Sequence, residues 1–119
     1  MEERRRFVRA DARLDAAYTI LPETTLRAAV TNDVSGGGAR LATDRVLAPG
    51  ASLQMAIALP GRDAPVNVVG EVAWSEPRAM TTQEGRRQSA ETGIRFAEIS
   101  PSDRDTLMAF VGKSLFLIQ

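Results

Sequence analysis

The sequence predicts an all-β domain: a six-stranded antiparallel β-barrel with a C-terminal α-helix and a flexible N-terminal arm. Three observations lead to this fold class. Hydrophobic residues alternate with a period of two along most of the chain, as they do in half-buried strands. The period becomes helical only near the C-terminus, after residue 100. A length of 119 residues, with 44% hydrophobic and 25% charged residues, fits one globular domain.

The predicted arm covers residues 1–10. It contains four arginines and almost no hydrophobic pattern, so we expect it to be flexible. The barrel is expected over residues 11–99. Its first strand covers residues 12–20 and ends before Pro22, because proline lacks the N–H group that a strand ladder needs.

Five further strands are predicted after the first. They are expected at residues 26–31, from residue 39 after a glycine-rich turn, and at residues 53–59, 66–74 and 92–96. Two Pro-Gly pairs mark turns on either side of the strand at 53–59. Residues 76–90 are rich in Gln, Thr, Arg and Glu, and we interpret them as a long solvated hairpin loop.

A C-terminal helix is predicted over residues 100–117. Ser100 is the candidate N-cap, Pro101 suits the first turn, and Asp103 stands where a capping box has its acidic residue. Helical spacing places five apolar residues on one face, namely Leu107, Met108, Val111, Leu115 and Phe116. We expect this face to pack on the strands and the helix to cover one opening of the barrel.

The composition excludes several classes of function. Without cysteine or histidine the chain has no thiolate and no imidazole, so we expect neither an enzyme nor a metal or other cofactor site. A net charge of zero argues against binding a nucleic-acid polymer. No apolar run exceeds five residues, the length of the run at residues 55–59, and this is far short of the roughly 20 residues that cross a bilayer. With no signal-peptide pattern either, we expect a cytoplasmic protein without membrane insertion.

Two short segments carry candidate binding residues. The arm holds a basic cluster in which Arg5 and Arg9 stand four residues apart, and taken alone this is most simply a solvated charged terminus. The segment Asp33-Val34-Ser35-Gly36-Gly37-Gly38 joins the second and third predicted strands, and taken alone it is most simply a hairpin turn. Its glycines also permit positive φ and a close approach of a ligand to the backbone.

In combination, the two segments resemble the signature of the PilZ domain family, the bacterial receptors for cyclic di-GMP. That signature is Arg-x-x-x-Arg in an N-terminal arm, followed by Asp/Asn-x-Ser-x-x-Gly. Here the first part corresponds to Arg5 and Arg9, and the second to Asp33, Ser35 and Gly38. Residues 70–74 and 93–96 also look like later barrel strands of the family, and a C-terminal helix follows, so the resemblance covers nearly the whole chain.

The resemblance implies a role for each matched residue. Arg5 and Arg9 would hold guanine and phosphate from the arm, since a guanidinium fork suits both groups. Asp33 and Ser35 would bind a base from the barrel surface, because an ionised aspartate only accepts and guanine offers N–H donors. Gly38 would let the turn close without a side chain in the way.

Three further residues are secondary candidates for contacting the ligand. Arg4 extends the basic cluster and could contact a second ligand molecule, and Arg6 lies in the same cluster. Trp74 could form part of the binding surface, although it is more simply explained as a core or rim aromatic residue.

The function that the resemblance implies is binding of cyclic di-GMP without catalysis. We expect the ligand to order the arm and so change the surface that an unidentified downstream protein meets. Two alternatives remain. One is a PilZ-type interaction module that does not bind the nucleotide. The other is a barrel of the OB type that binds single-stranded nucleic acid. It is disfavoured because the chain has no net positive charge and few aromatic residues.

Overall fold

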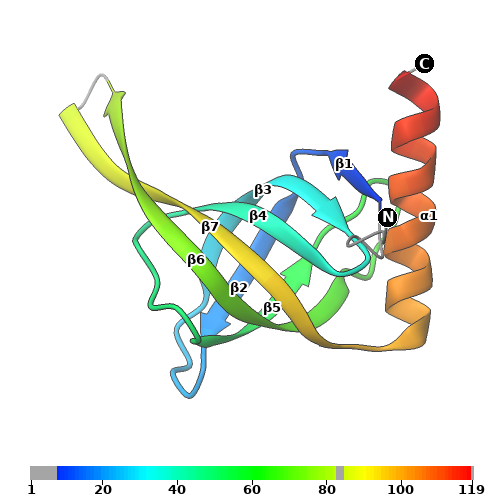
Figure 1. Ribbon diagram of the computed structural model, residues 1–119, viewed down its shortest axis with the longest axis horizontal. Coiled ribbons are helices and arrows are strands. Elements are labelled where there is room, and N and C mark those ends of the chain that lie inside the picture. Colours follow the sequence, from blue (N-terminus) through cyan, green and yellow to red (C-terminus); the bar gives the residue numbers. More distant parts are fainter. Residues whose placement is uncertain (1–7, 83–84, 119) are drawn as a thin grey trace, which may run out of the picture.

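The computed structural model describes residues 8–82 and 85–118. In these residues the chain forms seven strands and one helix (Figure 1). In chain order they are β1 (Arg9–Asp11), β2 (Asp15–Ile20), β3 (Arg27–Ser35), β4 (Gly38–Thr43), β5 (Ser52–Ile57), β6 (Val66–Thr82), β7 (Gly85–Ile99) and α1 (Pro101–Ile118).

Six of the strands close into a barrel. Their order is β3-β2-β5-β6-β7-β4, and pairing of β4 with β3 completes the ring. Every pairing is antiparallel, so the predicted six-stranded antiparallel barrel with a C-terminal helix is confirmed. Closure leaves these strands without the exposed edges that an open sheet would have.

The extra strand, β1, pairs with the C-terminal part of β3, with Arg9 opposite Ser35. Arg9 and Ala10, which the sequence placed in the arm, therefore belong to a strand. The first predicted strand, residues 12–20, is shorter than expected because the chain turns a corner before β2. At this corner the Thr31 hydroxyl donates to the Ala12 carbonyl and accepts from the Leu14 N–H group, in place of ladder bonds.

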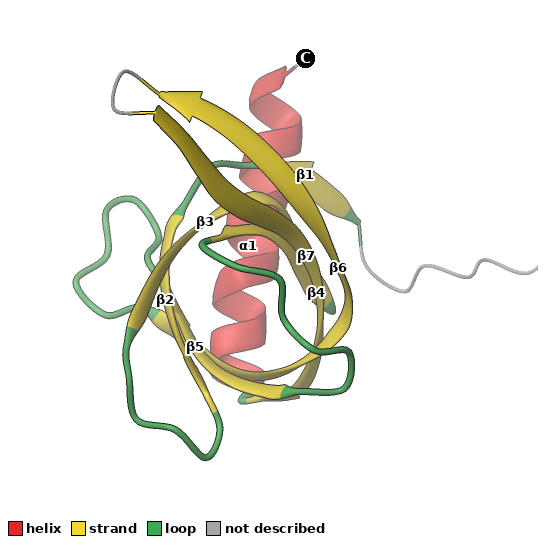
Figure 2. Ribbon diagram, turned by 90° about the vertical axis from the view of Figure 1, so that its left-hand side faces the viewer, coloured by secondary structure: helices red, strands yellow, loops and turns green. Residues whose placement is uncertain are grey.

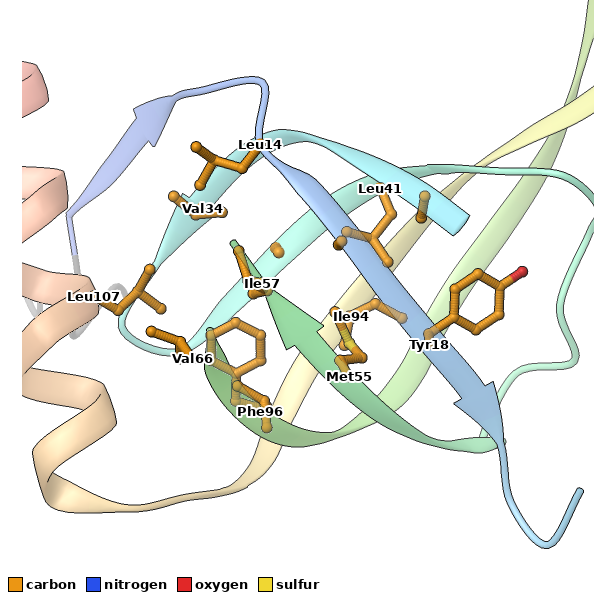
Figure 3. Close-up of a cluster of buried hydrophobic side chains, with 14 of the residues drawn as sticks. Leu14, Tyr18, Val34, Leu41, Met55, Ile57, Val66, Ile94, Phe96 and Leu107 are labelled. Atoms are coloured by element: carbon orange, nitrogen blue, oxygen red, sulfur yellow. The ribbon is translucent and has the colours of Figure 1, made fainter. Parts of the chain in front are cut away.

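Helix α1 lies across one end of the barrel (Figure 2). Leu107 and Val111 are buried in the common core, and Figure 3 shows Leu107 pointing into the barrel beside Val66. Met108 was expected on the same face but is 43% exposed, because it lies about 100° around the helix from Leu107. The predicted N-cap is present, since the Asp103 N–H group donates to the Ser100 hydroxyl at 3.0 Å. The side chains of residues 115–118 are outside the described part of the structure.

The interpretation of residues 76–90 as a loop was wrong. β6 and β7 stay paired beyond the barrel, from Glu76 opposite Glu91 to Thr82 opposite Gly85. They form a two-stranded ribbon that projects from the barrel wall (Figure 1). The ribbon lacks a hydrophobic pattern because no core lies beneath it, and this removes the signal by which strands are detected in a sequence.

Candidate functional site

The candidate site is a row of residues that crosses five adjoining strands. Asp11 on β1 lies opposite Asp33 on β3, and Asp33 lies opposite Arg40 on β4. Arg40 lies opposite Gly93 on β7, which in turn lies opposite Trp74 on β6. Cross-strand partners share a face of the sheet, so the row lies on one surface. All five residues line an open pocket of about 610 Å³.

Two β-bulges turn Asp33 and Trp74 of this row toward the outer face of the barrel. In β3 the pairing with β4 shifts between Thr31 and Asp33, so Asn32 is an extra residue. In β6 the pairing with β7 shifts in the same way between Val72 and Trp74. An extra residue reverses the alternation of faces. Strict alternation would have aimed Asp33 and Trp74 into the core, like the buried Thr31 and Val72.

Asp33 is held by two arginines. Its Oδ1 accepts from Arg9 Nη1 and its Oδ2 accepts from Arg40 Nε, each at 2.6 Å. The Asp33 side chain is 5% exposed, whereas those of Arg9 and Arg40 are 40% and 41% exposed. The hydrogen bond to Asp33 and the charge of that carboxylate raise the pKa of Arg40. The arrangement is a buried carboxylate covered by two guanidinium groups that face the pocket.

Ser35 stabilises the turn between β3 and β4. Its hydroxyl oxygen accepts from the Gly37 and Gly38 N–H groups at 3.2 and 3.1 Å, and the hydroxyl donates to the Gly38 carbonyl at 3.2 Å. Ser35 is also 4% exposed. Ser35 therefore lies beneath the site, where its hydrogen bonds fix the turn between β3 and β4.

Gly38 is needed for packing rather than for a special turn conformation. Among the described glycines, only Gly50 and Gly61 have positive φ, so the 36–38 segment does not use the positive φ that its glycines permit. A Cβ atom at Gly38 would lie 2.5 Å from the Ile94 carbonyl oxygen. The glycine therefore lets β4 approach the β7 backbone, which carries Gly93 of the row.

Trp74 is an exposed rim residue rather than a core residue. It is 37% exposed and lies over Gly93, where a Cβ atom would be 2.3 Å from the indole Nε1. Glycine at position 93 thus leaves room for the ring. The indole and Arg40 stand on the two sides of this glycine, and both line the pocket.

The structure brings together five of the predicted site residues. Arg9, Asp33, Gly38 and Trp74 line the pocket, and Ser35 lies below it. The other three, Arg4, Arg5 and Arg6, lie outside the described residues.

Sequence reasoning missed Arg40 and Arg95, which line the same pocket. Arg40 could have been found from the sequence. It stands two residues after Gly38, so alternation along β4 places both on one face, and the hairpin brings that face beside Asp33. Arg95 lies opposite Gly38 and pairs with Glu71 at 3.0 Å.

The described residues contain no group of three or more His, Cys, Asp or Glu side chains placed to hold a metal ion. Across the same ranges, no helix combines the length and the hydropathy needed to cross a membrane. The pocket offers three kinds of polar or stacking group: the guanidinium groups of Arg9, Arg40 and Arg95 for anions or purine acceptors, the carboxylates of Asp11 and Asp33 for N–H donors, and the Trp74 indole face for stacking.

The chain thus combines a closed antiparallel β-barrel with an open polar pocket on the barrel wall. The family model of the PilZ domain matches residues 3–113, so the chain belongs to the PilZ domain family, a family of cyclic di-GMP receptors. No curated protein sequence matches the chain.

Solved PilZ structures share the fold. The Bacillus subtilis inhibitor of motility, MotI, superposes with a TM-score of 0.73 at 20% identity over 98% of this chain. The chain spans about half the length of MotI, 53%. The PilZ domain of Escherichia coli YcgR with bound cyclic di-GMP gives a TM-score of 0.71 at 17% identity, over 98% of this chain and 95% of that domain.

Proposed function

We propose that the protein binds cyclic di-GMP in the pocket between Arg9 and Trp74 and has no catalytic activity of its own. The observation that carries this proposal is the direct contact between the two parts of the signature: Arg9 Nη1 lies 2.6 Å from Asp33 Oδ1. Residues separated by 24 positions in the sequence thus form one polar centre at the wall of an open pocket. A pocket of about 610 Å³ has the size of a small-molecule site.

Each part of the ligand has a complementary group in the pocket. Asp33 suits the N1–H and N2 amine of a guanine, a pair of donors that adenine lacks. Arg9 suits a phosphate or the O6 and N7 acceptors of guanine. The exposed face of Trp74 suits stacking with a purine, a contact worth about 1–3 kcal/mol per base. Ser35 supports Asp33 indirectly, because it fixes the turn in which β3 ends.

We propose further that the arm transmits the signal. Arg4, Arg5 and Arg6 precede β1, whose antiparallel pairing with β3 brings the chain to the pocket at Arg9. These cations repel one another, and a ligand with two phosphates offsets that repulsion. Closure of residues 1–8 over the ligand then changes the surface that a downstream protein meets in the bacterial cytoplasm.

Calorimetric titration with cyclic di-GMP and cyclic di-AMP tests the binding proposal. The wild-type protein is expected to bind the guanine dinucleotide and to discriminate against the adenine one. Arg9→Ala is expected to lose about 2–4 kcal/mol of binding free energy because a charge-assisted contact is removed. Arg62→Ala is the matched control, since Arg62 donates to the Thr106 hydroxyl at 3.0 Å and lines a different pocket.

Two outcomes would contradict this assignment. Equal affinity for both dinucleotides would show that Asp33 does not select guanine. A folded wild-type protein that binds neither would favour the alternative, a PilZ-type interaction module without nucleotide binding.

Amide exchange tests the arm. Residues 2–8 should exchange more slowly with cyclic di-GMP present, whereas Ala10 in β1 should be protected with and without it. Equal protection of residues 2–8 in both states would place the signal elsewhere.

A further inference from the structure

Two arginines cover the Asp33 carboxylate at the pocket wall, and the proposed function requires a ligand to reach it. Its side chain is 5% exposed, and each carboxylate oxygen already accepts from an arginine at 2.6 Å. A guanine that donates N1–H and N2–H engages both oxygens of a carboxylate. A carboxylate has about four lone-pair sites, but this one is 5% exposed beneath the two guanidinium groups, so a guanine reaches it only when at least one arginine moves aside.

Besides Asp33, Arg40 contacts a second carboxylate. Arg40 Nη1 lies 3.5 Å from Glu91 Oε1, while its Nε is bound to Asp33. Glu91 stands two residues before Gly93 on β7, so it lies on the same face as the row. Within the described part of the chain, the polar partner recorded for the Arg9 side chain is Asp33.

We propose that ligand binding is an exchange of partners, in which Arg40 leaves Asp33 and is taken up by Glu91. This inference rests on the proposed function and identifies two residues that set the affinity of the site. Arg40 competes with the ligand for Asp33. Glu91 accepts the Arg40 guanidinium after it leaves Asp33 and so lowers the free energy of that step. The guanidinium stays in the pocket, beside Trp74, where its charge still attracts the phosphates of the ligand.

The sign of the affinity change caused by Glu91→Gln separates the proposed role of Glu91 from simple charge attraction. Glu91→Gln removes a negative charge beside a pocket that takes an anion, and Coulomb attraction alone would then favour binding. In the exchange, the same substitution replaces the charged acceptor of the released guanidinium by a neutral amide oxygen and therefore weakens binding. The two explanations thus predict opposite changes in affinity.

The test is a double-mutant cycle in cyclic di-GMP affinity, measured by calorimetry. Glu91→Gln is expected to weaken binding about threefold to tenfold, the size of coupling common between residues in contact. In an Arg40→Ala background the same substitution is expected to change affinity less than about twofold. Glu98→Gln is the control of equal charge, because Glu98 is exposed on the same strand as Glu91 and lines a different pocket.

A nuclear magnetic resonance signal reports the exchange directly. The Arg40 Nε–H resonance should be protected from solvent in the free protein, where it donates to Asp33. It should shift and lose that protection when the site is saturated with cyclic di-GMP.

Two results would overturn the exchange alone: Glu91→Gln binding as tightly as wild type or more tightly, or an Arg40 Nε–H signal that stays protected in the complex. If the folded wild-type protein does not bind cyclic di-GMP, the proposed function fails and the exchange fails with it.

Discussion

Two aspartates of this domain have similar neighbours but opposite roles. Asp33 is 5% exposed and is covered by two arginines at 2.6 Å. Asp44 is 49% exposed, and it lies 3.4 Å from Arg27 and 3.8 Å from Arg45. The shortest contact of Asp44 is with Tyr18, whose hydroxyl donates to Oδ1 at 2.8 Å.

The difference lies in which partner is buried. Tyr18 is fully buried, and Figure 3 shows its hydroxyl at the end of the core opposite Leu107. Burial, together with the hydrogen bond to Asp44, raises the pKa of Tyr18. Burial of Asp44 opposes its ionisation, but the Tyr18 hydrogen bond and the nearby arginines lower its pKa overall. An exposed carboxylate that satisfies a buried hydroxyl stabilises the fold, whereas a buried carboxylate under half-exposed cations is suited to a ligand.

The largest expected effect is on ligand binding. Asp33→Ala should lose about 2–4 kcal/mol of cyclic di-GMP binding free energy, because it removes both acceptor oxygens and the charge. Asp44→Ala is the matched control, and its folded form should bind within about twofold of wild type. Calorimetric titration of both variants checks this. If both lose affinity equally, the functional distinction between the two aspartates is wrong.

The next effect concerns the backbone that supports Asp33. Gly38→Ala should lower the free energy of unfolding by about 2–3 kcal/mol, because the new Cβ meets the Ile94 carbonyl oxygen at 2.5 Å. Gly112→Ala is the control: it meets nothing within 4 Å, and in a helix it should stabilise by about 0.5–1 kcal/mol. Urea denaturation measures both. Equal stability of the Gly38→Ala variant and wild type would mean that β4 does not need this approach to β7.

The Tyr18–Asp44 pair should show an asymmetric cost. Asp44→Ala leaves the buried Tyr18 hydroxyl without its acceptor and should cost about 2 kcal/mol of stability. Tyr18→Phe leaves a carboxylate that water can reach and should cost about 1 kcal/mol. In the Tyr18→Phe background, Asp44→Ala should cost almost nothing. A denaturation cycle of the four proteins checks this, and additive losses would show that the two side chains act independently.

The smallest effect is on pH dependence. The pKa of Tyr18 is higher in the folded protein than its ordinary value of about 10, so the unfolded chain loses this proton first as pH rises. The contribution of Tyr18 to stability is therefore complete below about pH 10 and declines above it, by about 1 kcal/mol between pH 10 and 11. Tyr18→Phe should lack this decline. Parallel alkaline losses in both proteins would assign the effect to other groups.

The sequence predicted those strands and helices whose buried residues recur with a regular hydrophobic period. β5 was expected at residues 53–59 because Leu53, Met55 and Ile57 face the core, and all three are buried. The helix was expected from residue 100 because its cap and spacing are local. The family signature assigned Arg9 and Asp33 to one ligand site, but their direct contact was not predicted, since nothing local joins two residues that are 24 positions apart.

The ribbon, β1 and the composition of the pocket required the tertiary structure. The projecting part of β6 and β7 covers no core and therefore has no hydrophobic period. The bulges at Asn32 and Ala73 depend on which residues of neighbouring strands are paired, and that register comes from contacts that are distant in sequence. Alternation alone aims Asp33 and Trp74 inward, and one extra residue in each strand turns both toward the pocket. The chemistry of the site was thus readable from the residue types, but their common face was set by the long-range pairing of the barrel.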